Sequence, residues 1–181
     1  MADKLFTIKK NTISKSKLKF PYKIYLNNGR VIPTPNHHRF TTSYIKLHGC
    51  SLDTFYMALR FLGINKTMGE CKKYLDANYG LGGHSKYSLN QISKAINKIA
   101  SKNYATFYKK ATSKQINEAL KNGDMVLFEE RDPIHSVVLL YNGVKVKRFS
   151  SGTYKNITVS QEVKKRCGDS YYGGCVFVKR R

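Results

Sequence analysis

Cys50 stands directly before the segment with the clearest helical pattern in the sequence. Leu52, Phe55 and Leu59 follow it at helical spacing, and Gly63 fits the end of the helix. A thiol at a helix N-terminus lies near unpaired amide groups and the positive end of the helix dipole, which both favour the thiolate. The thiolate attacks carbonyl carbons, and the same amides can stabilise the oxyanion that forms. Cys50 is therefore a candidate nucleophile, and the alternative is a small buried residue without chemistry.

A thiol nucleophile needs an imidazole, which normally comes from a distant part of the chain. Of the five histidines, His135 begins the apolar strand predicted over 136–141 and follows Pro133. A rigid strand would hold its ring at the sheet edge, so His135 is the candidate base, and a structural histidine is the alternative. The other histidines are expected in exposed loops, or too near Cys50 along the chain to face it: His37, His38, His48 and His84.

The elements that must position these residues follow a simple order along the chain. A basic arm is expected over 1–20, and a hairpin around Asn27-Asn28-Gly29 follows it. Helical periodicity then predicts helices, and β-branched segments predict strands after them. Helices followed by an antiparallel sheet give an α+β class, with 1–40 as arm and hairpin and 41–181 as the rest of a single globular domain. The predicted helices span 51–62, 68–78, 88–100 and 113–120, and the predicted strands span 22–26, 30–32, 104–108, 125–129, 136–141, 145–149, 157–159 and 176–178.

The segment that begins at Gly49 also carries a resemblance to a known family. GCSLDTFYMALRFLG, over 49–63, resembles the nucleophile segment of the bacteriocin-processing (double-glycine leader) peptidases and their stand-alone relatives. Downstream, SKYSLNQISKAINKI resembles the helix that follows in those proteins, and residues 115–149 resemble their later helix and strands, including the histidine strand. The resemblance implies a papain-like fold, in which an N-terminal helical part packs on a C-terminal antiparallel sheet. It also implies that Cys50 is the nucleophile, that His135 is the general base, and that no cofactor or metal takes part.

Two supporting positions of the family pattern differ in this sequence. The family places a glutamine six residues before the cysteine to complete the oxyanion hole, and Tyr44 stands there instead. Tyr44 is therefore the candidate oxyanion donor, with Asn36 or His48 as alternatives. The residue that orients the histidine is expected about sixteen positions beyond it, where Ser151 is the candidate and Asn156 the alternative. An active cysteine peptidase and a catalytically inactive domain that binds a peptide or an acidic partner are thus both open.

The charge of the chain is strongly unbalanced, with 33 Lys and Arg against 11 Asp and Glu and a net charge of +22. Such a surface attracts anions, so the expected substrate is a peptide or a peptide-crosslinked anionic polymer such as a cell wall. Nucleic acid is a disfavoured third candidate, because the 13 Tyr and 9 Phe lack a clustered basic–aromatic pattern. No segment is long and apolar enough to span a membrane, and no signal peptide begins the chain. The protein is therefore expected in the cytoplasm unless lysis or a non-standard route releases it.

The remaining cysteines are Cys71, Cys167 and Cys175. No C-x-x-C pair occurs, which disfavours structural zinc and thioredoxin-like redox chemistry. Reduced, buried thiols are therefore expected. Cys167 and Cys175 flank a turn-like stretch and would close a small hairpin if they were oxidised, a geometry that the sequence leaves open.

Overall fold

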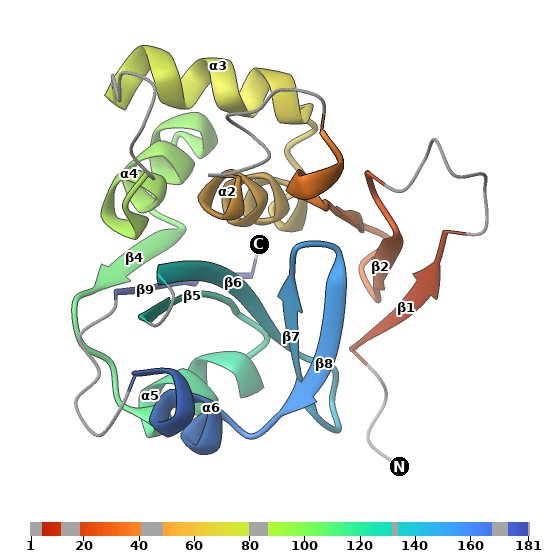
Figure 1. Cartoon of the computed structure of the whole chain (residues 1–181), viewed down its shortest axis with the longest axis vertical. Coiled ribbons are helices and arrows are strands. Elements are labelled where there is room, and N and C mark those ends of the chain that lie inside the picture. The colour runs from red at the N-terminus through yellow and green to blue at the C-terminus, as the bar shows by residue number, and fades with distance from the viewer. Residues whose placement is uncertain are drawn as a thin grey trace.

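A six-stranded antiparallel sheet with helices on both faces organises the protein, and a three-stranded sheet lies beside it (Figure 1). The computed structural model describes residues 5–11, 19–40, 49–79, 87–131, 134–167 and 174–180. The helices are the short 3-10 helix η2 (His37–Arg39) and the α-helices α2 (Cys50–Phe61), α3 (Met68–Tyr79), α4 (Leu89–Ala100), α5 (Ser113–Lys121) and α6 (Val159–Cys167). The strands are β1 (Phe6–Lys10), β2 (Tyr22–Leu26), β3 (Val31–Thr34), β4 (Ala105–Tyr108), β5 (Met125–Arg131), β6 (Ile134–Tyr141), β7 (Val146–Ser150), β8 (Thr153–Ile157) and β9 (Cys175–Val178).

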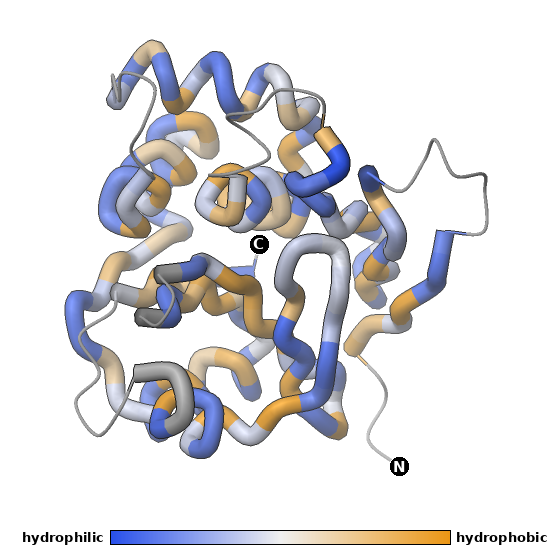
Figure 2. Tube along the Cα trace, viewed as in Figure 1, coloured by the Kyte–Doolittle hydropathy of each residue, from blue (hydrophilic) through white to orange (hydrophobic). Residues whose placement is uncertain are grey.

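The register of the six-stranded sheet decides which side chains face which helices. Its strand order is β4-β9-β5-β6-β7-β8, and each neighbouring pair is antiparallel. Successive side chains of a strand point to opposite faces. Along β6, Val138 and Leu140 enter the core shared with α2, α3 and α4, whereas Val137 and Leu139 enter the core shared with α5 and α6. The sheet therefore separates two hydrophobic cores. Figure 2 shows apolar segments of the central strands between the two helical layers.

Helix α2 is the most deeply covered of the described helices. It contacts β3, β5 and β6 on one side and α3 and α4 on the other. All of its residues except Arg60 are buried. A helix that is covered on every side gains most of its stability from tertiary packing, and a large apolar side chain such as Phe55 or Leu59 contributes roughly 1.5–3 kcal/mol when buried. This packing fixes the position of Cys50, the first residue of the helix.

The three-stranded sheet corrects the prediction of a loose arm at the N-terminus. Residues Phe6–Lys10 form β1, which pairs with β2 so that Phe6 lies opposite Leu26. Phe6, Ile24 and Ile32 are buried and join the core that surrounds α2. The alternation of Phe6 and Ile8 with polar residues is the strand signal in this segment. The expectation of an unstructured arm over 1–20 is therefore wrong for these five residues.

The region after β7 also differs from the prediction. The sequence predicts a strand over 157–159, but strand β8 ends at Ile157 and helix α6 begins at Val159. Val159 and Val163 are one helical turn apart, and both pack against the core beneath α5. By residue type, β-branched residues in a polar segment favour a strand. The helical spacing of Val159 and Val163 stabilises a helix only because both side chains can pack against the core beneath α5.

The other predicted elements are confirmed to within a few residues. The four predicted helices correspond to α2, α3, α4 and α5. Helix α5 begins with a capping box in which the side chain of Thr112 accepts a hydrogen bond from the backbone of Gln115. Among the described residues, no helix has the length and apolar character that crossing a bilayer would need. Cys175 begins β9, and the side chain of Cys167 lies outside the described residues.

The turn between β7 and β8 yields a prediction for stability. Gly152 has a φ of +75°, and a Cβ atom there would lie 2.6 Å from Cβ of Asn36 and 2.9 Å from Cγ of Pro21. Gly29 has a similar φ of +82° but open space around it. Both Gly→Ala changes carry the left-handed backbone penalty of roughly 1–2 kcal/mol. We expect Gly152→Ala to lower the free energy of unfolding measurably more than Gly29→Ala in urea titrations, and equal losses would contradict this packing.

Candidate functional site

Cys50 lies where the sequence places it, at the first residue of α2. Gly49 precedes it and provides no side chain to cap the helix. The first intrahelical hydrogen bond runs from the amide of Asp53 to the carbonyl of Gly49, so the amides of the preceding turn have no helical acceptor. Cys50 itself is 7% exposed. The thiol therefore occupies a buried position at the N-terminal, positive end of a helix.

A buried histidine and a buried aspartate form a hydrogen-bonded pair beside this helix end. Nδ1 of His37 lies 2.6 Å from Oδ2 of Asp53, and the two side chains are only 3% and 8% exposed. Asp53 comes three residues after Cys50 on α2, and residues at this spacing share one side of a helix. The imidazole of His37 is thus held against the same turn of α2 that begins with the thiol.

This pair corrects the expectation that His37 is exposed in a polar loop. His37 is 2% exposed, while His38, whose ring centroid lies 4.1 Å from that of His37, is exposed as expected. The contact joins residues 16 positions apart, and no local pattern connects them. One signal in the sequence could have found it, namely a carboxylate among the apolar residues of the best-patterned helix. A buried carboxylate needs a partner, and here the partner is His37.

Burial controls the protonation of Asp53. Loss of water around the carboxylate raises its pKa from 3.8 to about 6, even though the hydrogen bond and the charge of His37 lower it. An aspartate whose pKa is about 6 is largely ionised at neutral pH and protonated in mild acid. At neutral pH, the carboxylate can therefore accept a hydrogen bond from Nδ1–H of His37 and fix the orientation of the ring.

Several polar atoms around this pair are buried without a hydrogen-bond partner among the described residues. They are Oδ1 of Asn36, Oδ1 of Asp53 and Oγ of Ser136. Asp53 and Ser136 line one small cavity together with Gly152, and Asn36 lies against Gly152. Buried polar atoms are normally paired, and clusters of unpaired ones occur where a water or a ligand group binds. The surroundings of the His37–Asp53 pair can therefore hold a polar group.

His135 faces the other side of the sheet. It lies directly opposite Glu130 on β5, and the carboxylate of Glu130 bonds Nε and an amino nitrogen of Arg148 at 2.7 Å each. Arg148 also lies 3.1 Å from Glu162 of α6, so this face is the one that α5 and α6 cover. By alternation, the next residue, Ser136, points toward α2 instead. The structure therefore places Cys50 and His135, the predicted catalytic pair, on helix and sheet surfaces that do not face one another.

The hydroxyl that bonds His135 belongs to neither predicted residue. Nε2 of His135 lies 2.6 Å from Oγ of Ser150, which lies on β7. Ser151 is in the turn after β7 with a φ of +45°, and the side chain of Asn156 accepts a hydrogen bond from Lys147. The antiparallel pairing of β6 with β7 brings Ser150 near His135, and the predicted spacing misses this position by one residue.

Tyr44, the predicted oxyanion donor, and His48, an alternative to it, lie outside the described residues, as does His84. Asn36, an alternative oxyanion donor, lies near the site but has no demonstrated role. Cys71 is a second buried thiol, and burial raises its pKa to about 12, so it is chemically inert at neutral pH. No group of three or more His, Cys, Asp or Glu side chains that could hold a metal ion occurs among the described residues.

Comparisons with known proteins add no assignment to this geometry. No protein-family model matches the chain, and no curated protein matches it. The chemistry of the site therefore rests on its own side chains. These are a thiol at an uncapped helix end and a buried imidazole–carboxylate pair on the same helical turn.

The buried pair predicts how stability depends on pH. Because the pKa of Asp53 in the folded protein, about 6, exceeds its ordinary value of 3.8, its stabilising contribution is greatest below pH 3.8 and is lost as pH rises to about 6. Asp53→Asn removes this titration but can still accept a hydrogen bond. Relative to the wild type, its free energy of unfolding should rise by up to about 3 kcal/mol across this window.

The measurement is urea unfolding at a series of pH values, with the change Glu118→Gln at an exposed position of α5 as the control. The control should run parallel to the wild type through the same window. If the Asp53→Asn difference stayed constant from pH 4 to pH 6, the carboxylate would have an ordinary pKa and the pair would be misassigned.

Proposed function

We propose that the protein is a papain-like thiol hydrolase that cleaves a peptide or isopeptide bond through Cys50. The observation that carries this proposal is the buried His37–Asp53 pair on the same helical turn as the thiol. Nucleophile, imidazole and orienting carboxylate are the three groups that thiol hydrolases use. The packing of α2 on an antiparallel sheet, together with the resemblance around Cys50, also supports a papain-like arrangement.

In the proposed mechanism, His37 takes the role that the sequence suggests for His135. Nδ1 of His37 donates its hydrogen to Asp53, which leaves Nε2 to accept the thiol proton of Cys50. The sulfur attacks the carbonyl carbon, and the first-turn amides of α2 stabilise the oxyanion. The C–N bond then breaks, the leaving amine takes the proton from the imidazolium, and a thioester remains on Cys50. Water deprotonated by the same imidazole hydrolyses the thioester and releases the acid and the free thiol.

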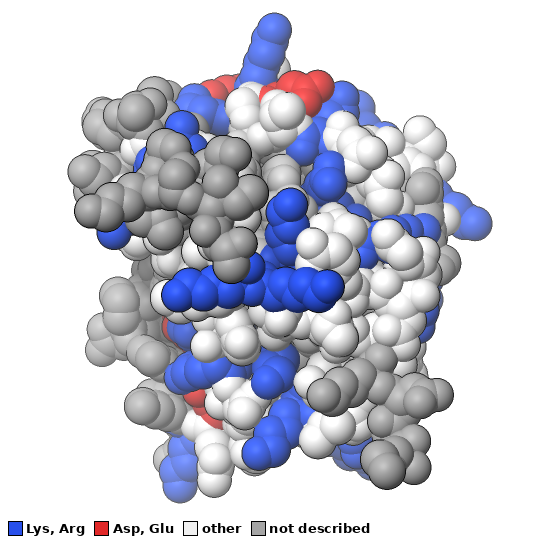
Figure 3. All heavy atoms as spheres, turned by 90° about the vertical axis from the view of Figure 1, so that its right-hand side faces the viewer, with Lys and Arg blue, Asp and Glu red and all other residues white. Residues whose placement is uncertain are grey.

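The charge of the surface supports an anionic substrate. Lys and Arg side chains are spread over the face of the molecule shown in Figure 3, and few carboxylates appear there. On the small sheet, Lys9 lies directly opposite Lys23, an arrangement of like charges that destabilises a strand pair. An anionic polymer near this surface would relieve that repulsion. A peptide attached to such a polymer, as in a cell wall, therefore suits the proposed enzyme.

A second candidate function is a peptide-binding or acid-binding domain that does not turn over. The burial of both Cys50 and His37 favours it, because a substrate carbonyl must reach the sulfur. In that case the His37–Asp53 pair is a structural contact that fastens η2 to α2. The two candidates differ in the reactivity of the thiol, which can be measured without knowledge of the substrate.

The test is the rate at which iodoacetamide labels Cys50 at neutral pH, followed by mass spectrometry. If His37 takes the thiol proton as proposed, we expect labelling of Cys50 to be at least about tenfold faster than that of an ordinary thiol. Cys71 in the same molecule is the internal control, since its burial and raised pKa make it slow. Labelling of Cys50 as slow as that of Cys71 would support the non-catalytic domain instead.

The variants His37→Ala and His135→Ala identify the imidazole. We expect His37→Ala to reduce the labelling rate of Cys50 strongly and to remove its dependence on pH near neutrality, because the thiol loses its base. His135→Ala should leave the rate unchanged, since the ring lies on the face covered by α6. The opposite result would overturn the assignment of His37 and restore the pair predicted from the sequence. Far-ultraviolet circular dichroism checks that each variant is folded.

A further inference from the structure

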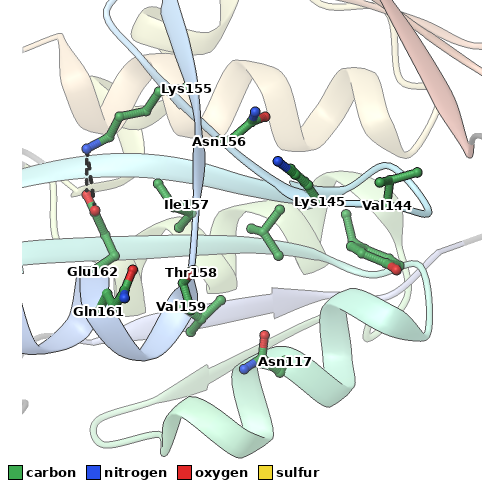
Figure 4. Close-up of a pocket in the computed structure, with 12 residues that line it drawn as sticks. Asn117, Val144, Lys145, Lys155, Asn156, Ile157, Thr158, Val159, Gln161 and Glu162 are labelled. Atoms are coloured by element: carbon green, nitrogen blue, oxygen red, sulfur yellow. Dashed lines mark hydrogen bonds and ion pairs between the residues drawn. The ribbon is translucent and has the colours of Figure 1, made fainter.

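A groove lies between α5, the start of α6 and strands β7 and β8, on the sheet face opposite α2 (Figure 4). Its volume is about 560 Å³, within the usual size of small-molecule sites. Val146, Ile157 and Val159 give it an apolar floor. Because the sheet lies between this groove and α2, the groove is separate from the proposed thiol site.

Two carboxamides at the groove are not used inside the protein. Asn117 extends from α5, and Gln161 lies in the first turn of α6, so the two side chains come from different helices (Figure 4). Neither forms a side-chain hydrogen bond to another described residue. A carboxamide offers both donors and an acceptor, and two of them in one groove suit a ligand with several hydroxyl groups. Thr158 adds a hydroxyl between β8 and α6.

The lining of the groove carries more cationic than anionic side chains. Glu162 is its only carboxylate among the described lining residues, and it lies 3.1 Å from Arg148 and 3.3 Å from Lys155. Arg148 is also paired with Glu130, so two cations, Arg148 and Lys155, meet two carboxylates. Lys145 lines the groove as well and has no carboxylate partner among the described residues (Figure 4). A ligand group with one negative charge would therefore be attracted to the groove near Lys145.

From these contacts, we infer that the groove binds an acidic sugar unit, which is a polyhydroxyl ring that carries one anionic group. The anionic group lies at Lys145, ring hydroxyls bond Asn117 and Gln161, and the C–H face of the ring covers Ile157. A purely apolar ligand would leave the carboxamides unpaired, and a bare anion would use only Lys145. This site does not depend on the proposed hydrolysis, since it is on the other face of the sheet.

The experiment titrates the full chain with single sugars and follows the backbone amide signals by NMR. The probes are glucuronate, a glucose phosphate, uncharged glucose and inorganic phosphate, each up to roughly 10 mM, a range that detects millimolar affinity. We expect at least one of the two charged sugars to shift signals of residues 144–146 and 155–162. Which of them binds more tightly identifies the anion as a carboxylate or a phosphate. Cys50→Ala should bind equally well, which separates this site from the thiol site.

Variants test the residues of the groove. We expect Lys145→Glu to weaken binding of the charged sugar at least about tenfold, because a repelling charge replaces the attracting one. Asn117→Ala should weaken it severalfold. Lys94→Glu is the matched control, since it makes the same charge change at an exposed position of α4 on the other side of the molecule. Equal losses for Lys145→Glu and Lys94→Glu would mean that only the overall charge matters, and would overturn the site.

Four further outcomes would also overturn the inference. Binding of inorganic phosphate as tight as that of the charged sugars would show a simple anion site, and binding of uncharged glucose as tight would show that Lys145 has no role. A short single-stranded oligonucleotide that shifts the same signals at much lower concentration would identify nucleic acid as the ligand. The absence of any shift in the groove with both charged sugars would mean that no acidic sugar binds there.

Discussion

The complete burial of α2 is the constraint on which the rest of the structure depends. The helix lies between the sheet and helices α3 and α4, so no side of it is left for solvent except at Arg60. Apolar residues satisfy this condition over most of its length, but its first turn also carries a thiol and a carboxylate. A charge in this position must be neutralised or paired, because burial of an isolated carboxylate is costly. The contact between Asp53 and His37 is the result.

That contact joins α2 to η2, the short helix that follows the three-stranded sheet. The strands β2 and β3 pack their buried residues Ile24 and Ile32 into the core around α2, and η2 follows directly after them. The packing of the small sheet thereby places His37 beside the start of α2. Burial raises the pKa of Asp53 toward neutrality, which is a feature of functional sites as well as of structural ion pairs. The contact also fixes the orientation of the His37 ring beside the first turn of α2.

The sheet divides the polar chemistry of the molecule between its two faces. On the α2 face, the polar atoms around Asp53 lack partners and surround a small cavity. On the other face, Arg148 lies within ion-pair distance of both Glu130 and Glu162, so the buried charges there are paired within the protein. His135 lies on this second face with Ser150. Beyond the network, between α5, α6 and the strands β7 and β8, the surface opens into the groove that contains Lys145.

The sequence by itself determined most of the elements and the position of the thiol, and the tertiary structure decided which face each side chain takes. The apolar spacing after Cys50 predicts α2 because helical periodicity is a local property. The strand that contains His135 could be predicted for the same reason, but its face could not. A shift of one residue in register moves every side chain to the other face, and that register is set by pairing with β5 and β7. The pairing of His37 with Asp53 depends on how the small sheet packs on α2, and this packing has no local pattern in the sequence.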